Sequence, residues 1–311
     1  PRFSMELYGI GRRSRSDVAI CYISDSVDQS VLDRMRSLIQ SIDVDALTMN
    51  IESLAECMFT HKWINPFPKF KYSERPDTAT AAILDGNIVI MVDNSPAVMI
   101  IPASIFDIIE EADDFNFSPM IGSYLRITRF FFSIVTWILT PLWLLLVNNP
   151  EWVPEFMKFI LITDDITVPV LLQLLILELA VDGLKLAAVN TPTMLSTPLS
   201  IVAGIVVGEY AVSSGWFNPE SLLYMAVVTV GTYGQTNFEM GYAFKFLRVL
   251  TLILTQIFNL GGFIAGVVIS VLMIAFNRTI TGKSYIYPLI PWDGKMLKRK
   301  VFRVRLPHSY K

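Results

Sequence analysis

Charged residues are scarce in this sequence. Aspartate, glutamate, lysine and arginine make up only 17% of its 311 residues, whereas soluble domains carry about a quarter, and 53% of the residues are hydrophobic. The mean hydropathy is +0.50. This composition argues against a wholly soluble protein and is typical of a membrane protein.

Cysteine and histidine are also rare. Cys21 and Cys57 belong to no CxxC motif or cysteine–histidine cluster, so we expect no disulfide framework or zinc site, and a reducing compartment is the simple inference. Histidine occurs only at His61 and His308, and no Walker A loop, GxGxxG, GxSxG or HExxH motif is present. We therefore predict no enzymatic activity, no catalytic residues, no metal and no cofactor.

The charges that are present are unevenly distributed: residues 1–119 hold most of them, and the apolar region that follows is nearly bare. We predict an α+β cytoplasmic domain with a small mixed sheet over residues 1–119. An all-α polytopic transmembrane domain over 120–278 and a basic cytoplasmic tail over 279–311 follow. No signal peptide opens the chain, and because it begins at Pro1 without an initiator methionine, we expect the first domain to be N-terminally truncated.

Residues 17–116 alternate between short apolar runs and helical patterns. Strands are predicted over 18–23, 46–49, 87–93 and 97–101, and helices over 31–42, 51–58, 76–84 and 103–111. The last two strands form a hairpin, and Asp28 or Ser30 caps the first helix. Pro76 begins the third helix and Asp85-Gly86 ends it.

Five apolar blocks follow, over residues 130–147, 166–189, 197–212, 221–238 and 249–277. The fifth is longer than one perpendicular span needs. Asn259-Leu-Gly-Gly262 lies near its middle, so it is either one tilted helix or a broken hairpin.

Positive residues indicate the orientation of these blocks. Arg126 and Arg129 precede the first block and the tail is basic, whereas the charged residues of 148–169 are mostly acidic. Both termini are therefore expected in the cytoplasm, which requires an even number of crossings. Either the fifth block is a broken hairpin or the second lies along the membrane interface, and we slightly prefer the second alternative because that block is charged.

The charges of the second block are Glu178, Asp182 and Lys185, which share one helix face by their spacing. Acids inside a membrane mark ion routes or pairs between subunits. In the alternative interpretation this helix lies at the interface, and its polar face meets headgroups or water. Both interpretations stay open.

Small residues mark two places where helices are expected to pack closely. Ser200, Gly204 and Gly208 stand four apart in the third block, and Gly262 and Gly266 form a GxxxG motif in the fifth. Such spacing lets helix backbones approach one another in lipid, so we assign these residues to helix packing.

Several short stretches stand in the same order as the motifs of a known protein family. They are Ser73 to Asp77, Leu84 to Asp93, Leu199 to Gly204, Gly208 to Val212 and Gly241 to Arg248. Together they resemble the GerA family of spore germination proteins, of the A-subunit type. The tail stretches Gly282 to Pro291 and Phe302 to Pro307 look closer to the SpoVAF branch than to nutrient-receptor subunits. The resemblance implies a multi-pass protein of the spore inner membrane that acts in endospore germination.

What the resemblance further implies is an oligomeric ion-channel subunit that releases ions during germination. The expected partners are other copies in a ring-shaped homo-oligomer, a small membrane partner protein and germinant receptor subunits, with anionic lipid at the basic tail and no nucleic acid. The alternatives are a non-conducting scaffold that clusters germinant receptors, and a secondary transporter.

Within such a ring, the third block is the predicted pore helix. Ile201, Ile205, Glu209 and Val212 are its predicted pore-lining residues. The two isoleucines would form an apolar constriction that gates by dewetting, and Glu209 a ring of negative charge that favours cations.

Overall fold

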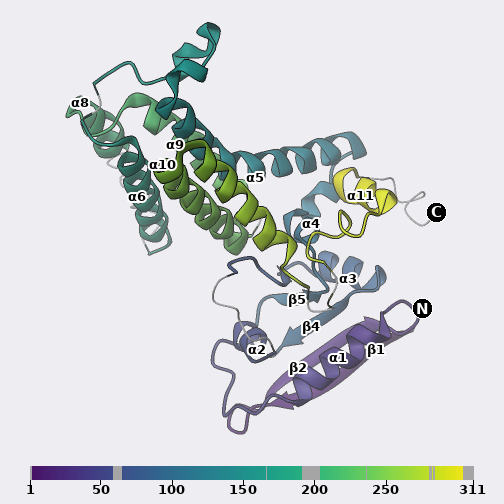
Figure 1. Cartoon of the computed structure of the whole chain (residues 1–311). Helices are drawn as coiled ribbons and strands as arrows, with labels where there is room; N and C mark the ends of the chain where they lie inside the picture. The colour runs from purple at the N-terminus through teal and green to yellow at the C-terminus, as the bar shows by residue number, and fades with distance from the viewer. Residues whose placement is uncertain are drawn as a thin grey trace. The chain divides into compact units, whose positions relative to one another are not determined.

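The structure, a computed structural model, describes residues 2–58, 65–165, 167–190, 204–235, 237–279, 282 and 284–303. The chain forms two compact units, one of residues 1–127 with 273–311 and one of residues 128–272. Figure 1 shows that the first contains a β-sheet and the second consists of helices. The tail, predicted as a separate segment, belongs to the sheet-containing unit.

The sheet of the first unit has five strands, and all neighbouring pairs are antiparallel. Its strands are β1 (Phe3–Ile10), β2 (Ser16–Ile23), β3 (Lys71–Ser73), β4 (Ile88–Val92) and β5 (Val98–Ile101), in the order β1-β2-β4-β5-β3. The α+β class agrees with the prediction, but the sheet is antiparallel rather than mixed. Short connections join β1 to β2 and β4 to β5, and such hairpins make neighbouring strands antiparallel.

The predicted strand over residues 46–49 is wrong, because this segment bonds to the β1–β2 turn instead of to the sheet. Arg13 donates its N–H to the carbonyl of Asp45 at 2.7 Å, and Leu47 donates its N–H to Ser14 Oγ at 3.3 Å. Leu47 is nevertheless buried in the core. The apolar run of residues 46–49 therefore indicated a buried segment and not a strand.

Helices cover both faces of the sheet. The helices of this unit are α1 (Gln29–Gln40), α2 (Ile51–Met58), α3 (Pro76–Leu84), α4 (Ile105–Ile109) and α11 (Gly294–Val301), with the 3₁₀ turn η1 (Ala112–Phe115). Side chains alternate along β2, so Val18 and Ile20 pack with α1 and α2, whereas Ala19 and Cys21 pack with α3. The bounds predicted for α3 are confirmed, and Gly86 ends it with φ +87°.

The second unit is a helical bundle. It contains most of α5 (Pro119–Asn148) and α10 (Phe238–Ala275), and the whole of η2 (Pro150–Trp152), η3 (Glu155–Ile160), α6 (Val170–Asn190), η4 (Gly204–Tyr210), α8 (Ala211–Ser213) and α9 (Pro219–Tyr233). Trp143 of α5 is buried in its core and stacks on Tyr224 of α9 with ring centroids 4.7 Å apart. Its indole nitrogen donates to the carbonyl of Ile160 at 2.8 Å, which ties the loop after α5 to the bundle.

Among the described residues, α5 and α10 are the two helices long and apolar enough to cross a membrane. However, α10 is broken at Asn259, whose backbone (φ 52°, ψ −130°) is not helical. A Cβ built on Gly262 would overlap the carbonyl oxygen of Leu254, and one on Gly266 would lie 2.9 Å from Cα of Thr251. In a straight helix, residues 254 and 262 are about 12 Å apart.

The fifth apolar block is therefore a helical hairpin, which was one of its two predicted alternatives. Figure 1 shows its halves, residues 238–258 and 260–275, side by side. At 1.5 Å per residue they extend over about 30 Å and about 23 Å. Glycine is needed at 262 and 266 because the two backbones touch there.

Polar side chains tie the helix ends together at the end of the bundle where this hairpin turns. The amides of Asn149, just after α5, and Asn259 donate to each other, at 2.6 and 2.9 Å. Gln173 of α6 and Asn218, just before α9, also exchange two hydrogen bonds, at 2.7 and 2.9 Å. These reciprocal bonds fix the register of the helices, and the register determines which side chains of neighbouring helices lie opposite each other.

Candidate functional site

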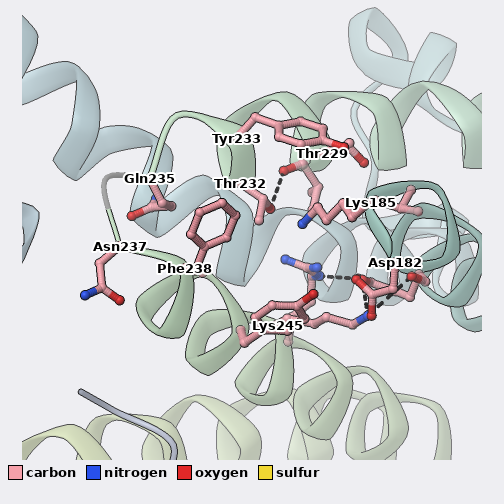
Figure 2. A pocket seen from close by; sticks show the side chains of 15 residues that line it. Asp182, Lys185, Thr229, Thr232, Tyr233, Gln235, Asn237, Phe238 and Lys245 are labelled. Atoms are coloured by element: carbon pink, nitrogen blue, oxygen red, sulfur yellow. Dashed lines mark hydrogen bonds and ion pairs between the residues drawn. The ribbon is translucent and has the colours of Figure 1, made fainter. Parts of the chain in front are cut away.

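Five charged side chains meet between the helices of the bundle (Figure 2). This bundle cluster consists of Glu178, Asp182 and Lys185 of α6 and Lys245 and Arg248 of α10. The helical period puts the three α6 residues on one face, and it does the same for the two α10 residues, which are three apart. The cluster forms because these two faces pack together.

Arg248 is the most buried cation of the cluster. Its Nε donates to Glu178 Oε1 at 2.5 Å, and its Nη1 donates to the carbonyl of Thr136 in α5. The Arg248 and Glu178 side chains are 3% and 6% exposed. Lys245 pairs with Asp182 and lies 3.7 Å from Glu178 Oε2. The cluster thus joins α5, α6 and α10.

A buried ion pair of this kind gains little stability over well-packed apolar side chains, because both ions lose their hydration. Removing one partner is nevertheless costly, since the other charge is left buried.

Lys185 differs from the other members because no carboxylate of the described residues lies within ion-pair distance of it. Its ammonium lies 5.1 Å from the ring centroid of Tyr233 and 5.6 Å from that of Tyr242. Both distances suit cation–π contacts, which partly replace a counter-ion. The cluster therefore holds three cationic side chains and two carboxylates.

A cavity of about 80 Å³ lies beside the cluster. Besides all five charged residues, its lining includes Thr229, Thr232, Tyr233, Gln235, Asn237, Phe238 and Tyr242. Figure 2 shows Lys185 reaching between Tyr233 and the Lys245–Asp182 pair. An ion or water entering this cavity would meet charged groups on one side and aromatic rings on the other.

The structure brings together the three charged residues that the sequence singles out on α6. Glu178 faces Arg248 and is buried, but α6 is not among the described helices long and apolar enough to cross a membrane, so the intramembrane and interfacial interpretations both stay open. Lys245 and Arg248 were not identified as their partners. The sequence could have indicated this pairing. Lys245 and Arg248 are three apart beside one apolar segment, and Glu178 and Asp182 are four apart in another, so each pair lies on one face of its helix.

The predicted pore helix is only partly described. Ser200 and Ile201 lie outside the described residues, as does the side chain of Ile205. Glu209 is exposed and Val212 is half-buried, and neither lines the cavity of the bundle cluster. Residues Gly204–Tyr210 form a π-helix, whose hydrogen bonds run from i to i+5, so the faces predicted for an α-helix do not carry over unchanged.

The glycines assigned to helix packing fall into two groups. Among the described residues, nothing lies within 4 Å of a Cβ built on Gly204 or Gly208. These two therefore approach no described helix of their own chain, and a packing role for them stays a prediction. Gly262 and Gly266, in contrast, lie where the halves of α10 touch.

A second charged network lies in the first unit. This tail junction consists of Lys71, Asp107, Glu110, Asp114, Arg126 and Lys300. Arg126 contacts Glu110 at 2.5 Å and Asp114 at 3.3 Å, and it donates to the carbonyl of Arg299 in α11 at 3.1 Å. Lys300 pairs with Asp107, and Lys71 donates to the carbonyl oxygens of Asp107 and Glu110, both at 2.7 Å.

Burial and pairing compete for the pKa values in the tail junction. Burial lowers the pKa of Lys71, whose partners are backbone carbonyls. Burial also acts to lower the pKa of Lys300, but the nearby charges of Asp107 and Glu110 outweigh it and the pKa is raised. For Asp107 burial acts to raise the pKa, and the Lys300 charge outweighs it, so the pKa is lowered. The Lys300–Asp107 pair thus stays ionised at neutral pH.

Comparison with known proteins identifies the family. The family model described as Bacillus/Clostridium GerA spore germination protein matches residues 1–311. The chain belongs to the GerA family. This confirms the resemblance found in the sequence. Stage V sporulation protein AF of Bacillus subtilis (strain 168) is 34% identical over 306 residues, which are 98% of this chain and 62% of that protein.

Other GerA proteins are similar at lower identity. Spore germination protein GerLA of Bacillus cereus is 27% identical over 99% of this chain and 62% of its own length. The crystal structure of the N-terminal domain of the A subunit of the Bacillus megaterium spore germinant receptor GerK3 is 28% identical, with a TM-score of 0.25, over 32% of this chain and 78% of that one. The chain spans 62% of the length of the two sporulation and germination proteins named here.

Proposed function

We propose that this GerA-family protein is an ion-conducting membrane subunit that releases ions during endospore germination. The observation that carries the proposal is the bundle cluster, in which charged side chains line a cavity between apolar helices. Charged side chains among the helices of a membrane protein are energetically costly and typically mark ion pathways. We expect the protein to lie in the inner membrane of the spore, with both termini on the side of the spore core.

The form of α10 supports a channel over a secondary transporter. Transporters typically break helices near the membrane midplane and bind substrate there. Here the break at Asn259 lies beside Asn149, at the end of α5, so it makes a turn between two helices. The bundle cluster lies away from this break and within continuous helices.

Assembly with other copies is part of the proposal. Glu209 is exposed, and a Cβ on Gly208 would touch nothing described, so both are available to another copy in a ring. In that ring Ile201, Ile205, Glu209 and Val212 would line the axis. Receptor subunits and a small membrane protein are further proposed partners, and the exposed Lys295 and Lys298 of the tail would contact anionic lipid.

Potassium release from liposomes that contain the purified full-length protein tests the proposal. The informative variant is Glu178→Leu combined with Arg248→Met, which replaces a buried ion pair by apolar side chains of similar size. We expect release by the unmodified protein and at least a tenfold slower release by the folded double variant. Unmodified protein that releases no more than empty liposomes would contradict conduction and leave the scaffold alternative. Equal release by both proteins would remove the bundle cluster from the pathway.

A further inference from the structure

We propose that the cavity of the bundle cluster binds a small monovalent anion, such as a halide or formate, through the ammonium of Lys185. The inference concerns the site on which the proposed function rests, but binding can be measured without conduction. Its basis is the charge of the cavity lining.

The lining has one cationic side chain more than it has carboxylates. Glu178 is bonded to Arg248, and Asp182 is paired with Lys245. Among the described residues, Lys185 contacts the rings of Tyr233 and Tyr242, which offer no full negative charge, and Asp182 attracts it only from beyond ion-pair distance. Among apolar helices, an ammonium without a counter-ion is unfavourable, and an anion in the cavity would supply one.

The start of α10 adds to the attraction. Asn237, Phe238 and Gly241 belong to the first turn of this helix or its cap, and all three line the cavity. The positive end of the helix dipole therefore points its field toward the same space as Lys185. Glu239 is the only acid of that turn, and it is exposed and does not line the cavity.

Size and donor supply narrow the chemistry of the ligand. About 80 Å³ holds only two or three groups of water size, since each water takes about 30 Å³. The hydroxyls of Thr229 and Thr232 already donate to the carbonyls of Met225 and Val228, at 2.7 and 2.8 Å. Lys185 is then the main cationic donor, beside the neutral donors of Asn237, Tyr233 and Tyr242, and this set suits a small anion with a single charge better than a phosphate.

A bound anion would change what the cavity offers to a passing cation. With the anion present, the lining is electrically balanced. Without it, the excess ammonium repels cations. We therefore expect potassium release to be faster in chloride than in gluconate, an anion too large for this cavity.

Thermal unfolding of the purified full-length protein tests the binding, with chloride compared with gluconate at equal ionic strength. We expect chloride to raise the Tm of the unmodified protein by several degrees. Lys185→Gln should lose this difference, and Lys185→Arg should keep it. Lys158→Gln is the matched control, because Lys158 is an exposed lysine of η3 outside the cavity and should leave the difference unchanged.

Bromide soaked into crystals gives the direct readout, by anomalous scattering at the cavity. The proposal is overturned by an equal Tm in chloride and gluconate, by a chloride effect that persists in Lys185→Gln, or by bromide only at other sites. Failure of the proposed function looks different. Bromide and Lys185-dependent stabilisation would be present, but potassium release would not exceed that of empty liposomes.

Discussion

The tail junction and the bundle cluster use the same residue types to different ends. In the tail junction the three cations all have oxygen partners, and the nearby cavity of about 210 Å³ is lined by more acids than bases. In the bundle cluster the described contacts of Lys185 are with aromatic rings, and the cavity lining has an excess of positive charge. Excess acid is tolerated in the first unit because Asp77 and Asp85 are exposed to water. In the bundle cluster the excess charge lies on Lys185, which is half-buried, and the proposed anion would balance it there.

The largest expected loss of stability comes from breaking the ion pairs of the bundle cluster. Arg248→Met leaves the buried Glu178 with only the more distant Lys245, at 3.7 Å, and removes the donor to the Thr136 carbonyl, so it should lower the free energy of unfolding by about 3–5 kcal/mol. The double variant Glu178→Leu/Arg248→Met should return to within about 1 kcal/mol of the unmodified protein. Thermal unfolding in detergent measures both. A double variant as unstable as the single one would show that the pair itself holds the bundle together.

Breaking the tail junction should cost somewhat less. Arg126→Met leaves Asp114 fully buried, but Glu110 keeps Lys300 at 3.6 Å, so we expect a loss of about 2–4 kcal/mol. The same variant removes the bond from Arg126 to the end of α11. Limited proteolysis should therefore cut within residues 284–303 faster than in the unmodified protein. Unchanged cleavage would mean that Arg126 does not hold the tail.

Acid should loosen the tail junction, because it protonates Asp107, the carboxylate that pairs with Lys300. The pKa of Asp107 is lower in the folded protein than its ordinary value of 3.8. Its contribution to stability is therefore complete above about pH 5 and is lost as the pH falls through and below 4. Hydrogen exchange of α11 between pH 7 and pH 3, corrected for intrinsic rates, should show this loss. The loss should be smaller in Lys300→Met, where the Asp293 cap of α11 still titrates, and unchanged in Asp164→Asn, a change at an exposed carboxylate.

The smallest expected loss of stability is that of a Lys185 variant, and it separates a charge that holds the bundle together from one that is proposed to bind a ligand. Lys185→Met removes two cation–π contacts and no ion pair, so in gluconate we expect a loss of no more than about 1 kcal/mol. Thermal unfolding of this variant beside Arg248→Met gives the comparison directly. A loss as large as that of Arg248→Met would place Lys185 among the structural charges.

Local rules predicted several elements well. Pro76 and Gly86 bound α3 as expected, because proline suits the first turn of a helix and glycine its left-handed end. The strands β4 and β5 lie within the predicted runs of apolar residues. The same rules failed for residues 46–49 and did not identify β1, since a strand is stabilised by neighbours that the local sequence does not reveal.

The sequence by itself determined the apolar composition that predicts a membrane protein, the two-part organisation of the chain and the shared face of Glu178, Asp182 and Lys185. Composition and the helical period are enough for that. Only the tertiary structure decided that Glu178 meets Arg248, 70 positions away, and that α10 turns back at Asn259. Pairing at such separations depends on which helices pack together and at what register. One position of sliding would turn these charges away from each other, and no local pattern encodes that choice.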